Sequence, residues 1–440
     1  MRSSKSIIAQ LALLQFVITS LFPAIALAWT IVEVSSTMNP VGSGSRATGM
    51  GGAFIGVADD ATAASWNPAG LIHLERPEFS LVYSTFRRTQ AYDSTSHPEV
   101  DSTHAMDTEG VNFASFAYPF LLCKKNMVVS LNYQRLYELS KRGSIRYTRD
   151  IDGMQQEDQI EFQQSGYLYA LSPAMSVRLL PTLALGATLN LWSNYVGTNG
   201  WEYTYLSLAT SDAGGTPLVM ESEIRRQITF TGTNANVGLL WNVNGPMTVG
   251  AVFKTPFTAR LRDKTVSYEA SSLPELGIYQ ADTNRTNTTL TMSMPYSYGL
   301  GLQYRHSDAQ TFAIDLYRTA WSRYSLTERR GATFNPVSGQ PLQDGRLQDT
   351  TQVRLGAEHL LIRENDVIPL RCGVFYDPEP QTDSHDDYYG LSLGTGYTRD
   401  RVAFDLSYQY RFGAGVSSEM QQVNVDLKQH TMMGSMVYRF

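Results

Sequence analysis

The sequence predicts an all-β chain: a transmembrane antiparallel β-barrel of about fourteen strands whose lumen is plugged by an N-terminal helical hatch. Three features predict this fold. Apolar and polar residues alternate over long stretches, short turns alternate with long polar segments, and a stretch rich in glycine and alanine precedes the first strand. We expect residues 1–28 to be a signal peptide, residues 29–76 the hatch and residues 77–440 the barrel.

The N-terminus has the features of a secretory signal peptide. Arg2 and Lys5 precede an apolar run, and Ala26-Leu27-Ala28 supplies the small residues of a cleavage site. The chain is therefore predicted to be exported and to begin near Trp29 after cleavage. No cysteine sits at the cleavage site, so a lipoprotein is not predicted.

Composition limits the possible classes of protein. The formal net charge of −6 argues against a nucleic-acid partner. The chain holds 25 tyrosines while only 17% of its residues are charged, a mixture that suits a surface lying partly in a membrane interface. Its two cysteines, Cys123 and Cys372, could pair, but they are too few for a disulfide framework.

Residues 401–412, RVAFDLSYQYRF, show the alternation most clearly. One face carries Val402, Phe404, Leu406, Tyr408, Tyr410 and Phe412, and the other carries Ala403, Asp405, Ser407, Gln409 and Arg411. This alternation is longer than a typical soluble strand, and it matches a tilted strand that turns apolar side chains to lipid and polar ones to a lumen. The pattern recurs at 126–134, 182–195, 311–318 and the C-terminus, where the chain ends on Phe440.

The joints between these stretches differ in length on the two sides of the predicted membrane. Short turns are expected at Leu180-Pro181, Asn244-Gly245-Pro246, His306-Ser307-Asp308 and Thr398-Arg399-Asp400. Long polar loops are expected at 89–110, 141–156, 198–225, 264–287, 321–348, 377–387 and 413–429. The strands are then expected at 78–88, 111–119, 126–140, 157–177, 182–197, 226–242, 247–262, 288–304, 310–320, 349–359, 367–376, 388–398, 401–412 and 430–440. This asymmetry is typical of outer-membrane barrels, so we expect the chain in the outer membrane of a Gram-negative-type bacterium.

A barrel of this size needs something inside it. Backbone groups that face lipid must be paired, so the sheet has to close. About fourteen strands enclose more space than the eight-strand barrel that side chains alone can fill. Residues 29–76 lack the strand alternation and carry small residues, so we expect them to fold inside the barrel.

The stretch GMGGAFIGVADDATAASWNPAGL, from Gly49 to Leu71, gives the hatch its local structure. Asp59 or Asp60 can cap a short helix at Ala61–Trp66. That helix ends because Pro68 disfavours a helical conformation at Asn67. Three glycines before the helix permit close packing or positive φ angles: Gly49, Gly51 and Gly52.

Residues 42–71, which end in Asn67-Pro68-Ala69, resemble the FadL family of outer-membrane transporters for hydrophobic compounds, including its TodX-like branch. Weaker similarity at 296–305, 312–322, 353–361 and 368–381 extends the resemblance over most of the mature chain. The resemblance implies a hatch of short helices inside a fourteen-stranded barrel. It also implies that Asn67, Pro68 and Ala69, with Gly49, Gly51 and Gly52, form the element that gates the lumen.

The predicted loop 198–225 is unusually apolar for an aqueous loop. It contains Trp201, Tyr203, Tyr205, Leu206 and Leu208. The resemblance implies that this loop and 264–287 form a groove that first captures the substrate. Two alternatives remain open: the apolar residues could pack the loop against itself, or they could be the outer ends of long strands.

No catalytic site is predicted. Gly390–Gly394, GLSLG, fits the nucleophile-elbow pattern, but strand alternation runs through it, so Ser392 is expected to face the lumen from a strand. The acidic residues around His385 are interpreted as a solvated loop rather than a metal site. We expect no enzyme activity, no cofactor and no metal.

We therefore expect a passive transporter of small hydrophobic molecules such as fatty acids or hydrocarbons, with hatch-gated release either sideways into the bilayer or into the periplasm. The expected partners are the transported molecule, outer-membrane lipid, lipopolysaccharide and the barrel-assembly machinery, which would read the C-terminal Phe440, and the expected state is a monomer. One alternative is a PorV-like barrel that shuttles or holds proteins in secretion. Another is an open porin for polar solutes.

Overall fold

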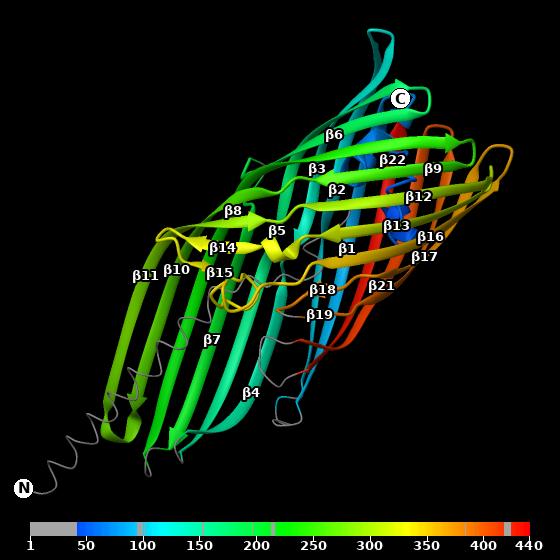
Figure 1. Cartoon of the computed structure of the whole chain (residues 1–440). Coiled ribbons are helices and arrows are strands. Elements are labelled where there is room, and N and C mark those ends of the chain that lie inside the picture. The colour runs from blue at the N-terminus through cyan, green and yellow to red at the C-terminus, as the bar shows by residue number, and fades with distance from the viewer. Residues whose placement is uncertain are drawn as a thin grey trace, which may run out of the picture.

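The computed structural model describes residues 42–94, 100, 102–151, 154–195, 197–212, 216–382, 384–417 and 424–440. It confirms the predicted barrel, in which fourteen antiparallel strands form a closed wall (Figure 1). In order around the wall the strands are β1 Glu78–Asp93, β2 Ser102–Leu122, β3 Lys125–Glu138, β5 Met154–Leu180, β6 Leu183–Trp192, β8 Pro217–Asn244, β9 Met247–Lys254, β12 Ser297–Ser307, β13 Gln310–Thr319, β16 Thr350–Ile362, β17 Val367–Tyr376, β20 Tyr389–Arg399, β21 Val402–Ser417 and β22 Asn424–Arg439. The predicted signal peptide and residues 29–41 lie outside the described residues.

The barrel closes by pairing its first strand with its last. β1 and β22 pair in one register from Glu78 opposite Arg439 to Asp93 opposite Asn424. The predicted alternation is confirmed in β21, where Phe404 and Leu406 are exposed on the outer face and Ser407 and Arg411 are buried on the inner face. The wall is therefore apolar toward lipid and polar toward the lumen.

Several segments predicted as long loops are strands instead. β4 Lys141–Ile151, β7 Gly200–Asp212, β10 Phe257–Leu273 and much of β11 Ile278–Met294 replace three of those loops, and β5 and β8 continue past the barrel to reach 27 and 28 residues. β4, β5, β7, β8, β10 and β11 pair in this order to form a sheet that continues beyond the barrel, toward the lower left in Figure 1. We call this sheet the extension, and "up" means toward it. The prediction was wrong because a strand that leaves the membrane can be polar on the face that water solvates.

Two predicted strands are each divided by a proline. The predicted strand 247–262 breaks at Thr255-Pro256 into β9 and β10, and the predicted strand 288–304 breaks at Pro295-Tyr296 into β11 and β12. Proline cannot donate a ladder hydrogen bond, so strand pairing is interrupted there. Beyond the break β10 pairs with β11, whereas β9 pairs with β12 inside the barrel.

The remaining described elements are short. They are the helices α2 Ser45–Gly49, α3 Ala63–Trp66, η3 Pro68–His73, η5 Pro274–Leu276 and η6 Trp321–Arg323, and the strands β14 Ser325–Glu328, β15 Thr333–Phe334, β18 Glu379–Pro380 and β19 His385–Asp386. In the part of the chain that the structure describes, no helix has both the length and the apolar character needed to cross a membrane. Cys123 and Cys372 are both free and exposed, so they do not pair.

Candidate functional site: the luminal hatch and the adjoining cavity

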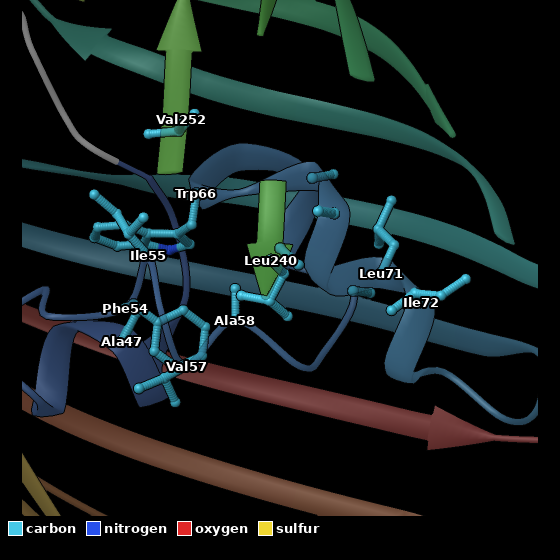
Figure 2. Packing of buried hydrophobic residues seen from close by; sticks show 14 of the residues in the cluster. Ala47, Phe54, Ile55, Val57, Ala58, Trp66, Leu71, Ile72, Leu240 and Val252 are labelled. Atoms are coloured by element: carbon cyan, nitrogen blue, oxygen red, sulfur yellow. The ribbon is translucent and has the colours of Figure 1, made fainter. Parts of the chain in front are cut away.

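Residues 42–74 lie inside the barrel and form the described part of the hatch. Their apolar side chains are buried, and Phe54 packs edge-to-face on Trp66 with ring centroids 5.9 Å apart (Figure 2). Gly51 and Gly52 have φ angles of +67° and +74°, which confirms the predicted need for glycine at these two positions. Gly49 has no positive φ, but a Cβ on it would lie 3.0 Å from the Cα of Gly394 in the wall.

The wall carries glycines where the hatch backbone touches it. At each of seven inward positions a Cβ would crowd or overlap hatch atoms: Gly186, Gly238, Gly250, Gly301, Gly356, Gly373 and Gly394. Six of them form cross-strand pairs, Gly186 with Gly238, Gly250 with Gly301, and Gly356 with Gly373. This glycine track lets the hatch backbone approach the strands from β6 round to β20 more closely than any side chain would allow.

The Asn67-Pro68-Ala69 signature joins two parts of the hatch to the wall. Asn67 is extended, with φ −145° and ψ 101°, as predicted for a residue before proline, and Pro68 begins η3. The Asn67 Nδ2 donates to the carbonyl oxygens of Ile55 and Leu239, both at 2.9 Å, and its Oδ1 accepts from the Ala69 amide. Since Leu239 lies on β8, this one side chain connects the hatch loop, the η3 turn and the barrel.

The helix predicted at Ala61–Trp66 is shorter than expected. α3 covers only Ala63–Trp66, because Asp60 Oδ1 accepts from the Thr62 amide at 2.8 Å and holds the preceding residues in a turn. Asp60 therefore caps that turn rather than the helix itself. Burial raises the pKa of the Asp60 carboxyl; nearby Arg46 lowers it, and neighbouring Asp59 raises it.

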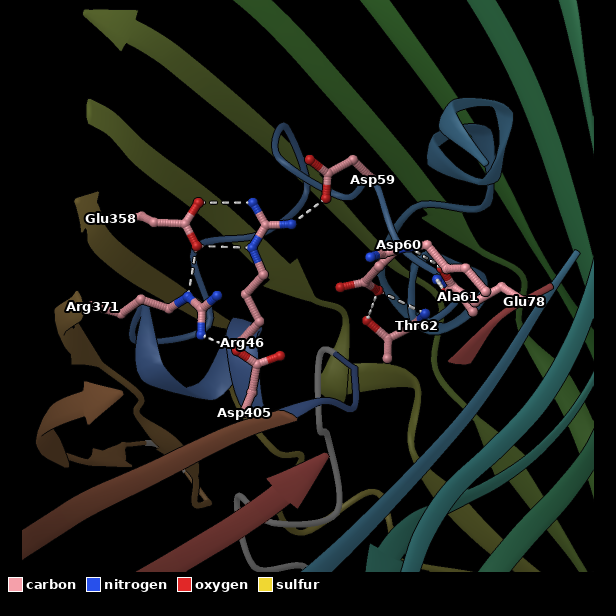
Figure 3. Close-up of polar contacts among 10 residues, drawn as sticks. Arg46, Asp59, Asp60, Ala61, Thr62, Glu78, Glu358, Arg371 and Asp405 are labelled. Atoms are coloured by element: carbon pink, nitrogen blue, oxygen red, sulfur yellow. Dashed lines mark hydrogen bonds and ion pairs between the residues drawn. The ribbon is translucent and has the colours of Figure 1, made fainter. Parts of the chain in front are cut away.

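A network of charged side chains fixes α2 to the wall. Arg46 donates two hydrogen bonds to the carboxylate of Glu358 on β16, at 2.8 and 2.9 Å, and also pairs with Asp59 (Figure 3). Arg371 on β17 donates to the same carboxylate at 2.6 Å and to Asp405 on β21 at 2.5 Å. Burial lowers the pKa of Arg46, but the carboxylates of Asp59 and Glu358 outweigh this and hold it above the usual value.

Backbone groups of the hatch make further contacts with the wall. Asp315 Oδ2 on β13 accepts from the amides of Phe54 and Ile55, at 2.6 and 2.8 Å. Arg354 on β16 donates to the Gly51 carbonyl at 3.1 Å. Ser392 faces the lumen from β20, as predicted, and donates to the Gly49 carbonyl at 3.1 Å.

Pairing between β2 and β3 stops partway up the wall. It ends at Phe113 opposite Gln134, although β2 continues upward beside β1. Both strands carry a register irregularity at this level, where Asn112 in β2 and Leu136 in β3 are each left without a partner residue. Bulges of this kind end a ladder and redirect side chains. We call the stretch beyond Phe113 and Gln134, where β2 and β3 run without ladder pairing, the lateral gap.

Hydrogen bonds from side chains link the two edges of the gap in the part of the chain that the structure describes. At its lower end Asn112 Nδ2 donates to the Arg135 carbonyl at 3.4 Å, and Arg135 Nη1 donates to the Glu109 carbonyl at 3.2 Å. Farther along β2, His104 Nε2 lies 2.8 Å from the Ser144 carbonyl oxygen of β4. The guanidinium of Arg135 also lies over the ring of Tyr167, 4.4 Å from its centroid.

A cavity of about 170 Å³ lies between the hatch and this gap. Thr48, Gly52 and Trp66 of the hatch line it, with Asn112 of β2 and Arg135–Glu138 of β3 on the gap side. The lining of this cavity is mixed in character. Its polar lining residues include Arg354, Asp377, Gln409 and Arg411, and its apolar ones include Phe86, Leu136, Phe375 and Met433.

The family model for outer membrane protein transport proteins (OMPP1/FadL/TodX) matches residues 42–437. The chain belongs to this FadL/TodX family. It is therefore an outer-membrane β-barrel transport protein and not an enzyme, as the sequence predicted. No curated protein matches the chain significantly in sequence.

Solved structures of FadL/TodX proteins share the fold. A Pseudomonas aeruginosa FadL homologue is 12% identical with a TM-score of 0.57, and the match covers 91% of this chain and 98% of that one. The Pseudomonas putida toluene transporter TodX is 13% identical with a TM-score of 0.58, over 93% and 100% of the two chains. The Ralstonia pickettii toluene transporter TbuX is 14% identical with a TM-score of 0.52, over 91% and 98%.

In this FadL/TodX protein the five predicted capture residues do not share one face. They lie on β7, which pairs with β5 and β8, so the prediction of a loop was wrong. Trp201, Tyr203 and Tyr205 alternate onto the inner face, whereas Leu206 and Leu208 are exposed on the outer face. Trp201 is buried in an apolar cluster where the barrel meets the extension, here called the upper cluster, with Trp192, Phe230, Leu261, Met292, Trp321 and Tyr324 among its members.

Sequence reasoning missed the residues of the wall that receive the hatch. Glu358, Arg371 and Asp315 stand at inward positions of predicted strands. Charged residues at such positions could have indicated that the wall binds something inside the lumen. The same holds for the inward glycines of the wall. Their partners could not be predicted, since Arg46 and Glu358 are 312 residues apart in the sequence.

Proposed function

We propose that this chain is a passive transporter of small hydrophobic molecules, such as long-chain fatty acids or hydrocarbons. The molecules bind in the lumen and leave when the hatch shifts, through the lateral gap between β2 and β3. The family assignment supports transport across the outer membrane. The solved structures named as toluene transporters support a hydrophobic substrate.

The observation that carries the proposal is the position of the gap beside the cavity. Leu136, the unpaired residue of β3, lines the cavity and also belongs to the upper cluster. A hydrophobic molecule that enters below the extension thus meets apolar side chains down to the level of the gap. Each buried methylene contributes about 0.8 kcal/mol to binding, so movement along this route needs no nucleotide or ion gradient.

The route gives separate tasks to residues of the chain. The inner-face residues Trp201, Tyr203 and Tyr205 capture the molecule above the membrane, and the hatch residues Asn67, Pro68 and Ala69 control its descent. Arg135 closes the lower end of the gap, because its side chain bridges to β2 and stacks on Tyr167. No step breaks a covalent bond, so the residues act only by binding and by moving.

A disulfide across the gap tests this proposal. Cysteines at Asn112 and Arg135, in a background with Cys123→Ser and Cys372→Ser, would join β2 to β3 just above their last pair. We expect uptake of radiolabelled oleate or toluene by whole cells to fall when the disulfide forms and to recover on reduction. If uptake recovers on reduction, its loss was due to the disulfide across the gap and not to the replacement of Asn112 and Arg135.

A matched disulfide between Tyr118 and Val129 is the control, because these positions already pair across β2 and β3 below the gap. It should leave uptake unchanged. Equal uptake with the gap joined and open would exclude lateral release. Mass spectrometry of small molecules that co-purify with the protein tests the substrate class independently, since a protein-secretion scaffold would yield a partner protein instead.

A further inference from the structure

The outer face of β10 carries an unbroken row of cations. Arg260, Arg262 and Lys264 occupy successive outward positions and are exposed, while the residues between them, Leu261 and Asp263, are buried on the opposite face. None of the three cations makes an ion pair within the described residues. Like charges two residues apart on one face repel one another, so the row is unfavourable unless a partner neutralises it.

Neutral hydrogen-bonding side chains flank the row on both sides. On β8 the residues opposite Arg260, Arg262 and Lys264 are Thr231, Thr229 and Gln227, and on β11 they are Thr291, Thr289 and Asn287. At Val266, the next outward position of β10 after Lys264, the partner residues are Arg225 on β8 and Arg285 on β11. We call Arg225, Arg260, Arg262, Lys264 and Arg285 the cationic strip.

The strip contains almost no negative charge of its own. Glu223 on β8 pairs with Arg225 at 2.5 Å, but no carboxylate stands opposite the row on β10. The whole chain has a net charge of −6, so this concentration of cations runs against its average composition. A surface of this kind attracts an anion whose charges are spaced along the strand direction.

The strip lies beyond the lipid-facing band, on the side of the extension. On β8, Val237 and Trp241 are exposed on the outer face, and Thr231 and Thr229 lie on that same face farther along the strand. The outer face of β8 therefore continues from the lipid-facing residues to the strip. Val237 pairs with Phe253, an outward aromatic residue of the kind that marks a membrane interface. Thr231 is six residues farther along, about 20 Å on the strand and about 15 Å in height if the strand tilts by about 40°.

We propose that the cationic strip binds the phosphate groups of lipopolysaccharide in the outer leaflet. Arginine and lysine make short charge-assisted hydrogen bonds to phosphate, and arginine can do so with two donors at once. The threonine, glutamine and asparagine side chains beside the row suit the hydroxyl groups of the attached sugars. The extension then rests on the glycolipid surface rather than standing free above it.

The test replaces Arg260, Arg262 and Lys264 together by glutamine and measures binding of bis-phosphorylated lipid A to the full-length protein by native mass spectrometry in mild detergent. We expect the affinity to fall at least about tenfold. The wild-type protein should show a similar loss when dephosphorylated lipid A replaces the bis-phosphorylated form. Heat-modifiable migration on gels verifies that the variant barrel is folded. The single Arg262→Gln variant should lose less affinity for lipid A than the triple variant.

The matched control replaces three exposed cations at the opposite rim, Arg305, Arg399 and Arg401, by glutamine. It should bind lipid A like the wild type. Equal binding by wild type and strip variant, or equal loss in the control, would overturn the proposal. The strip does not line the cavity, so uptake should survive its removal, and failure here is distinguishable from failure of the transport proposal.

Discussion

The contact between Arg46 and Glu358 provides the sharpest test of how the hatch is held. Replacing Arg46 by methionine keeps an unbranched side chain of similar reach but removes both hydrogen bonds to Glu358. The Glu358 side chain is only 4% exposed, so water cannot readily replace the hydrogen bonds that its carboxylate loses. We expect α2 to leave the wall more often in this variant.

The size of the effect follows from the geometry. Removing one partner of a buried ion pair typically costs about 3–5 kcal/mol. Here Arg371 still donates to Glu358, and the Arg46 side chain is 21% exposed, so we expect the lower value of about 2–3 kcal/mol. Since about 1.4 kcal/mol is a factor of ten, the undocked fraction should rise by about 30-fold to 150-fold.

Single-channel recording in planar bilayers measures this fraction as the probability of ion-conducting openings. The variant Arg399→Gln is the control, because it breaks an exposed pair with Asp400, whose contribution is small. The double variant Arg46→Met with Glu358→Met should recover part of the loss, since no buried carboxylate then lacks its donor and Arg371 keeps Asp405 as a partner. An open probability within about threefold of wild type for Arg46→Met would refute the reasoning.

Three further predictions follow from the same structure. Gly373→Val places side-chain atoms against Gly51 and Met50 of the hatch, so it should reduce the free energy of hatch docking by about 1–3 kcal/mol and make the barrel leaky. Gly434→Ala is the control: a Cβ there has nothing within 4 Å, so this variant should conduct like the wild type. Burial raises the pKa of Asp60, so the ionised carboxyl weakens hatch docking above that raised pKa, and the penalty disappears as the pH falls toward the ordinary value of 3.8. Ion-conducting openings should thus become rarer on mild acidification, and Asp60→Asn should remove this pH dependence. A pH profile of Asp60→Asn identical to that of the wild type would contradict the assignment to Asp60. Trp201→Ala empties a buried site in the upper cluster and should cost about 3–5 kcal/mol, seen as faster hydrogen exchange in β7 and β8, while the outward Leu206→Ser should leave that exchange nearly unchanged.

The sequence was sufficient where one physical rule decides the structure. Within 401–412, lipid on one side and the lumen on the other impose the period of two, so the faces of β21 could be assigned residue by residue. Pro68 likewise determines the conformation of Asn67 without any knowledge of the rest of the fold. Both predictions depend only on neighbouring residues and on the solvent that each face meets.

The sequence was insufficient where several environments give the same pattern. Residues 200–212 are polar and aromatic, which suits an aqueous loop as well as a strand with one wet face, and only pairing with β5 and β8 distinguishes them. The positions of Asp315 and Glu358 could be assigned to the inner face. Their partners depend on which strand closes against which and in what register, and alternation carries no information on either.

The way the hatch is packed indicates how it can move. Its large apolar side chains, among them Phe54, Val57 and Trp66, pack chiefly with one another and with alanines of the hatch, whereas the wall contributes mostly alanine and valine to that cluster. Its attachment to the wall combines these small apolar contacts with hydrogen bonds and ion pairs from residues such as Arg46, Asn67 and Asp315. Water that enters the cavity can replace those polar contacts one at a time, but it cannot replace the apolar core of the hatch. Displacement of the hatch as a unit therefore costs less free energy than unfolding it.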